Sequence, residues 1–106
     1  MKNRNSHLQR LADEWTVYKL AMCSASPTEV FDKAEEIAGM KEAYDYLCSN
    51  EISTAELDCV MRSANPIAKV YDTYEAYQMN GQESSIPLAV YEIWASQAHR
   101  SKQQER

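Results

Sequence analysis

The sequence predicts an all-α protein, a compact bundle of about five helices in a single domain over residues 1–106. Two glycines and three prolines are too few for a sheet-rich chain, which needs a turn about every ten residues. Apolar residues recur at spacings of three and four, and no stretch alternates as a strand does. We expect the ordered part to span about residues 6–100.

The first helix is predicted from a stripe of apolar residues over about 16 positions. Its members are Leu8, Leu11, Trp15, Tyr18 and Met22. Spacings of three and four place all of them on one helix face.

The second helix is predicted to begin at a capping box. Ser26 is the cap, Pro27 fits the first helical position, and Glu29 can reach back to the N–H of the cap. Two apolar stripes follow, one of Val30, Ala34, Ile37 and Ala38 and one of Met40, Tyr44, Leu47 and Cys48. The stripes are ten residues apart and therefore about 80° out of phase, so we expect a bend or break near Gly39.

A short third helix is predicted over about residues 54–63. Ser53 and Glu56 form a second capping box, and Ile52 can pack on Leu57 in the first turn.

The fourth helix is expected to open at the cap and proline of Asn65-Pro66 and to stop at Asn80-Gly81. Ser85 and Pro87 mark the start of the fifth helix, and the polar segment 101–106 is expected to fray.

The predicted core is the set of apolar and aromatic residues on these stripes. It comprises Leu11, Trp15, Tyr18, Val30, Phe31, Ile37, Leu47, Leu57, Val60, Ile67, Val70, Tyr71, Leu88 and Trp94. Cys23, Cys48 and Cys59 cannot all pair and show no Cys-x-x-Cys spacing, so neither a disulfide framework nor a zinc site is predicted. We expect all three to be interior.

Catalytic side chains are few. His7 and His99 lie near the termini and are expected to be solvated, although a pair formed by the two ends is the alternative. Serines that start helices are explained by capping, and Cys48 or Cys59 would need a base that the sequence does not identify. The sequence therefore predicts neither an enzyme nor a cofactor.

Paired carboxylates at Asp13-Glu14, Glu35-Glu36, and Asp72 with Glu75 could serve hydrolysis or metal binding. The Glu-x-x-His motif of di-metal bundles is absent, so we expect these pairs to be solvated and no metal to be bound.

Charge is unevenly distributed along the chain. The net charge is −5, but residues 29–92 hold thirteen acidic residues against four basic ones, a charge of −9. Such a segment repels nucleic acid and attracts basic protein surfaces. The alternative is that the acidic faces serve only solubility.

We expect one acidic surface on the second and fourth helices to contact a partner. Its predicted members are Asp32, Glu35, Glu36, Glu42, Asp45, Tyr46, Asp72 and Glu75. Tyr46 would anchor the contact, or it would be partly buried against a neighbouring helix.

Ser26-Pro27-Thr28-Glu29-Val30, the segment 65–71 and Ile93 in the last helix resemble a small helical family of unknown function. That family is carried by conjugative elements and prophages of gut bacteria. The resemblance implies a small accessory protein of a mobile element. By analogy, such proteins are often inhibitors of host defence, anti-CRISPR proteins among them.

The sequence thus predicts a protein that blocks the basic, nucleic-acid-binding surface of a host protein, for example a Cas nuclease, and does not itself bind nucleic acid. A structural or adaptor module that acts by helix–helix contacts or as a homodimer is the alternative. No apolar run reaches the roughly 20 residues of a membrane span, so we expect a cytoplasmic monomer or homodimer.

Overall fold

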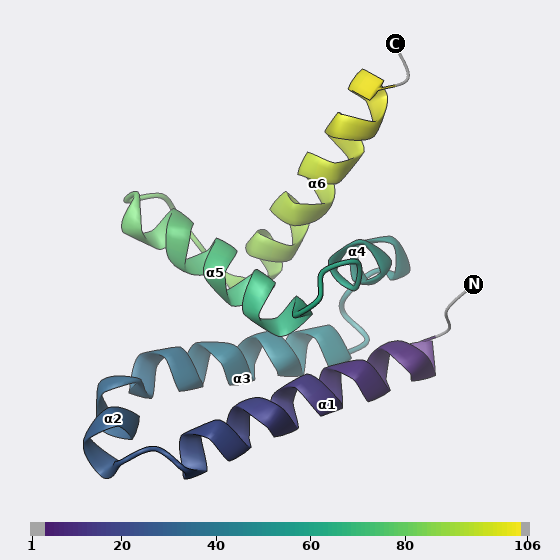
Figure 1. Cartoon of the computed structure of the whole chain (residues 1–106). Helices are drawn as coiled ribbons and strands as arrows, with labels where there is room; N and C mark the ends of the chain where they lie inside the picture. The colour runs from purple at the N-terminus through teal and green to yellow at the C-terminus, as the bar shows by residue number, and fades with distance from the viewer. Residues whose placement is uncertain (1–3, 105–106) are drawn as a thin grey trace.

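Six helices in two layers make up the chain, as the computed structural model shows (Figure 1). It describes the backbone of residues 4–104 and the side chains of residues 4–97. The helices are α1 (Arg4–Cys23), α2 (Pro27–Asp32), α3 (Ala34–Cys48), α4 (Thr54–Val60), α5 (Pro66–Met79) and α6 (Ile86–Gln104). In Figure 1, α1 and α3 run antiparallel and α2 connects them at one end, while α4, α5 and α6 form the second layer. The all-α prediction is confirmed.

The predicted helix starts are confirmed at three serines. The amides of Glu29 and Glu56 donate to the hydroxyl oxygens of Ser26 and Ser53, each over 3.2 Å, and both capping boxes are complete. Ser85 accepts from the third residue of α6 in the same way. These side chains satisfy amides that have no partner inside their own helices.

The break in the second predicted helix lies at Lys33 and not near Gly39, so that prediction is wrong. Lys33 has φ −100° and ψ 13°, and it separates α2 from α3. Gly39 lies inside α3, where an added Cβ would collide with the ring of Tyr71. The glycine therefore lets α5 approach α3 closely, and the early break raises the number of helices from five to six.

The core lies between the two layers. Of the predicted core, Leu11, Leu47, Leu57, Val60, Ile67, Val70 and Tyr71 are buried, whereas Trp15, Tyr18, Val30, Ile37, Leu88 and Trp94 are half-buried. Further buried residues are Met40, Ala43, Ile52, Met61, Ile86, Ala89, Val90 and Ile93.

Phe31 is the clear error in the predicted core, because its side chain is 81% exposed. The six residues of α2 bury none of their side chains, since the break at Lys33 ends this helix before it can pack along its length. Two of the cysteines also differ from expectation. Cys59 is buried as predicted, but Cys23 is exposed and Cys48 is half-buried.

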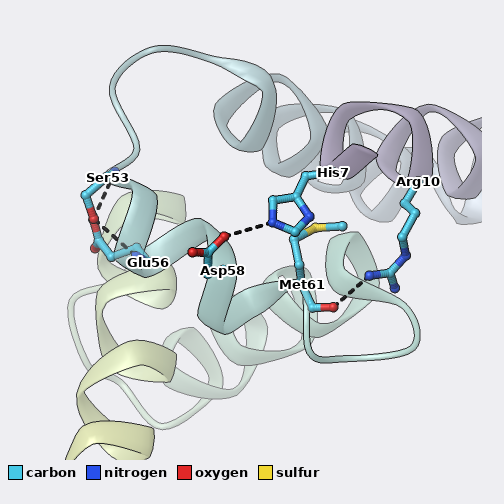
Figure 2. Close-up of polar contacts among 6 residues, drawn as sticks. All are labelled: His7, Arg10, Ser53, Glu56, Asp58 and Met61. Carbon is cyan, nitrogen blue, oxygen red and sulfur yellow. Dashed lines mark hydrogen bonds and ion pairs between the residues drawn. The ribbon is translucent and has the colours of Figure 1, made fainter. Parts of the chain in front are cut away.

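One side of α1 holds α4 through polar contacts (Figure 2). His7, predicted to be solvated, is only 4% exposed, and its Nε2 lies 2.8 Å from Oδ1 of Asp58. Arg10 donates to the carbonyl oxygens of Met61 over 2.8 Å and of Ser63 over 3.1 Å, just beyond the end of α4. The side chain of His99, also predicted to be solvated, lies outside the described residues, and so does the alternative of a pair formed by the two histidines.

Two further residues of α1 cap other helices. Arg4 donates to the carbonyl oxygens of Cys48 and Ser49 at the end of α3. Glu14 accepts from the amides of Ile67 over 2.8 Å and Ala68 over 3.1 Å at the start of α5. Cations at helix C-termini and anions at N-termini complement the helix dipoles.

The start of α5 corrects two predictions. Asn65, the predicted cap, makes no side-chain capping bond. Glu14, expected to be solvated, is half-buried and fills that role from another helix. The sequence spacing of Arg4, His7, Arg10 and Glu14 places all four on one face of α1.

Candidate functional site

An open apolar groove of about 770 Å³ lies between the second half of α1, α2 and the start of α3. Its walls include Trp15, Tyr18, Met22, Val30, Phe31 and Ile37. Its only charged lining residue among those described is Lys19. Large apolar hollows of this kind mark binding sites on protein surfaces.

Stacked aromatic rings build one wall of the groove. The ring centroids of Trp15 and Tyr18 are 5.7 Å apart, and those of Trp15 and Tyr44 are 5.6 Å apart. The stack joins α1 to α3 and holds the Trp15 ring in place. Tyr18 also lines a second hollow, of about 590 Å³, between α1 and the start of α5.

Carboxylates from α3 and α5 converge beside this groove. The Tyr71 hydroxyl donates to Glu75 over 2.8 Å. Burial raises the pKa of Tyr71 well above its ordinary value, and the hydrogen bond to Glu75 and the charges of Glu75, Glu36 and Glu35 raise it further. Burial, with the charge of Glu36, also raises the pKa of Tyr18. The charges of Glu35, Glu36 and Glu75 thus all act on the Tyr71 hydroxyl, and we call these three residues the carboxylate cluster.

The other predicted acidic residues are all exposed, but they differ in their surroundings. Asp32 ends α2 directly before the break, and Asp72 lies next to Tyr71 in α5. Glu42 is on α3, nearly two turns beyond Glu35 and Glu36 of the carboxylate cluster. Asp45 forms an ion pair with Lys41 over 3.0 Å, and both side chains are exposed, so the pair contributes little to stability.

Tyr46 does not join the acidic surface. Its side chain is half-buried and packs against the core. Burial raises its pKa, together with the charges of Glu56 and Glu51, which lie beyond the end of α3. The alternative of partial burial therefore describes Tyr46 better than the role of an exposed anchor.

The basic residues of the N-terminal segment do not neutralise the carboxylate cluster. Arg4 and Arg10 are bound to carbonyl oxygens. Among the side chains that the structure describes, the ion pairs are those of His7 with Asp58 and Lys41 with Asp45. Within residues 4–97, no ion pair joins the cluster to a basic side chain.

The apolar groove was not predicted from the sequence, because Phe31 was assigned to the core. One feature of the sequence could have indicated the groove: the second half of α1 carries apolar residues around most of its circumference. A helix of that kind needs cover on more than one side.

Within residues 4–97, no three histidine, cysteine or acidic side chains are grouped so that they could hold a metal ion. No helix among the described residues has the length and apolar character to cross a membrane. Comparisons with protein-family models, curated proteins and solved structures find no match for this chain. The resemblance to a family of mobile elements therefore stays a prediction.

Proposed function

We propose that this chain is a non-enzymatic binding protein of a mobile element or phage. In this proposal it inhibits a host defence protein, such as a Cas nuclease, by covering a basic surface that normally holds nucleic acid. The observation that carries the proposal is the carboxylate cluster, which has no basic partner among the described side chains. Closely spaced carboxylates on a rigid helical surface present negative charge much as a phosphate backbone does.

Two features support a protein partner over a small substrate. The carboxylate cluster and the exposed Asp32 and Glu42 extend over three helices, which is the scale of a protein contact. The neighbouring groove is apolar and open, and apolar area beside charge is typical of protein interfaces.

A cleavage assay tests this function. Purified Cas nucleases are assayed on duplex DNA with and without the chain, and binding of the guide-loaded nuclease to DNA is measured in parallel. We expect the chain to slow cleavage and to compete with DNA. Inhibition without competition would contradict the proposal that it occupies the nucleic-acid surface.

Charge-matched variants locate the contact. Glu35→Lys with Glu42→Lys should abolish inhibition, whereas Glu51→Lys with Glu83→Lys should leave it unchanged. All four side chains are exposed and both variants change the net charge equally. Circular dichroism checks that both variants stay folded, because Glu35 lies in the first turn of α3 whereas Glu51 and Glu83 lie outside the helices. Equal loss in the two variants would show that only net charge matters.

An adaptor module or homodimer is the second candidate. The apolar groove and the exposed Phe31 favour it, because such surfaces often form helix–helix contacts. Sedimentation of the chain alone tests this function. A tight dimer would favour the homodimer, and a monomer would favour the inhibitor.

A further inference from the structure

The apolar groove exposes a large aromatic side chain where burial would be favourable. Phe31 is 81% exposed, although the ring forms part of the groove wall. Trp15, Tyr18, Met22 and Val30 in the same wall are only half-buried, so the exposed apolar surface continues beyond Phe31. Apolar surface of this size costs free energy in water and is retained where a partner covers it.

The form of the groove suits a helix. Helices α1 and α3 lie side by side, and α2 crosses between their ends (Figure 1). The hollow of about 770 Å³ can accept several side chains in a row. An amphipathic helix presents such a row at positions i, i+3 or i+4, and i+7.

The charged residues beside the groove indicate which kind of helix would bind there. Asp32 and Glu35 are exposed and lie between the wall residues Phe31 and Ile37 in sequence. Glu36 is close enough for its charge to raise the pKa of the wall residue Tyr18. The margin on the side of α2 and α3 thus carries three carboxylates against one lysine, Lys33, while Lys19 lines the groove from α1. The margin is acidic on balance, and an occupant with lysine or arginine beside its apolar face complements it.

A second copy of this chain fits less well. The chain carries a net charge of −5, and a two-fold contact would place the acidic margins of two copies against each other. Of the basic residues on α1 that the structure describes, Arg4 and Arg10 are already bound to carbonyl oxygens, which leaves one lysine, Lys19, against the three carboxylates of each margin. Like charges at an interface oppose association.

We propose that the groove between α1, α2 and α3 binds an amphipathic helix of a partner protein, with an apolar face and flanking lysine or arginine residues. Phe31 and Trp15 contact the apolar face, and Asp32, Glu35 and Glu36 contact the basic flank. This proposal shares one premise with the proposed function, namely that the acidic residues contact a basic partner, and it rests on the proposed function in that respect alone.

A synthetic peptide is the probe. It is a helix-forming peptide of about 15 residues with leucine at i, i+4, i+7 and i+11 and lysine on both flanks of that stripe. One comparison peptide has glutamate in place of lysine, and another has the same composition without an apolar face. Fluorescence anisotropy should show the lysine peptide binding at least about tenfold more tightly than either comparison peptide.

Two variants of matched exposure test the place of binding. Phe31→Ser should weaken binding of the lysine peptide by about tenfold or more. Met79→Ser removes a side chain that is 80% exposed at the end of α5, so binding should be unchanged. Chemical-shift mapping on the unaltered chain gives a readout that needs no variant, and we expect changes at the Trp15 indole and the Val30 amide.

The proposal is overturned if no peptide binds, if Phe31→Ser binds as tightly as the unaltered chain, or if the shift changes lie away from the groove. A dimer that Phe31→Ser dissociates would also overturn it, because the occupant would then be a second copy. Failure of the proposed function looks different. In that case the lysine peptide binds and Phe31→Ser removes binding, but no nuclease is inhibited in competition with DNA.

Discussion

Replacement of Glu14 by alanine tests whether α1 organises the bundle by capping its neighbours. Both carboxylate oxygens of Glu14 accept backbone amides at the start of α5, over 2.8 and 3.1 Å. No side chain within α5 or next to it replaces this cap, because Asn65 makes no capping bond. The variant leaves two half-buried amides without their acceptor.

The expected loss follows from these contacts. Loss of an N-cap costs about 0.5 to 2 kcal/mol, and a favourable charge at a helix N-terminus contributes about 0.3 to 1 kcal/mol. The site is half-buried, so we expect Glu14→Ala to lower the free energy of unfolding by about 2 kcal/mol. For a domain of this size that corresponds to a fall in Tm of roughly 8 to 16 °C.

Urea unfolding followed by circular dichroism measures this loss, and Asp13→Ala is the matched control. Asp13 is the preceding residue of α1, carries the same charge and is exposed, with a side-chain contact only to Gln9 among the described residues. Aspartate forms helices less well than glutamate, so Asp13→Ala gains more helix propensity than Glu14→Ala, by less than about 0.7 kcal/mol. The expected loss of about 2 kcal/mol at Glu14 exceeds this difference. Equal losses in the two variants would refute the capping role of Glu14.

Three further predictions concern local features. Gly39→Ala should lower the free energy of unfolding in urea by about 1 to 3 kcal/mol, because the new methyl group meets the Tyr71 ring; a gain in stability would contradict this close approach. Folding raises the pKa of Tyr71 above its ordinary value of 10.0, so the protonated hydroxyl stabilises the folded state. This contribution to the free energy of unfolding is full below pH 10 and is lost as the pH rises further. Tyr71→Phe should therefore lose less stability than the unaltered chain between pH 9 and 11, and equal losses would count against it. With a thiol reagent, the exposed Cys23 should react first, since burial raises the pKa of Cys48 and Cys59; three equal rates would disprove this order.

Signals that act within a few residues were predicted correctly. The capping boxes at Ser26 and Ser53 involve a residue and its third neighbour, so the sequence alone contains both partners. The same is true of Gly81, whose φ of 74° suits the end of a helix. Apolar periodicity also identified the helices themselves, because it reports which face each helix buries.

Contacts between distant residues were not predictable in this way. Glycine often marks a helix break, but Gly39 instead lets the chain approach the Tyr71 ring, which is 32 positions later in the sequence. His7 and Glu14 form hydrogen bonds with residues more than 50 positions away, and the sequence around each of them does not predict those contacts. A polar residue on a helix face is usually solvated, so the sequence favoured that reading.

The charge distribution along the chain pointed to the acidic residues of α3 and α5, and in the structure the charges of Glu35, Glu36 and Glu75 all act on the Tyr71 hydroxyl. Their role in binding a partner stays a prediction. The groove could not be predicted because it depends on the break at Lys33, which the sequence pattern placed elsewhere. That break turns α2 away from the core and leaves Phe31 in solvent.

The salt dependence of the inhibited complex tests most directly whether exposed carboxylates hold the partner. The dissociation constant of the chain with a nuclease that it inhibits is measured between about 50 and 300 mM salt, a range over which screening shortens to less than about 10 Å. We predict an affinity that falls steeply as salt rises, and a much shallower fall for Glu35→Lys with Glu42→Lys. An affinity that stays constant over this range would contradict the account.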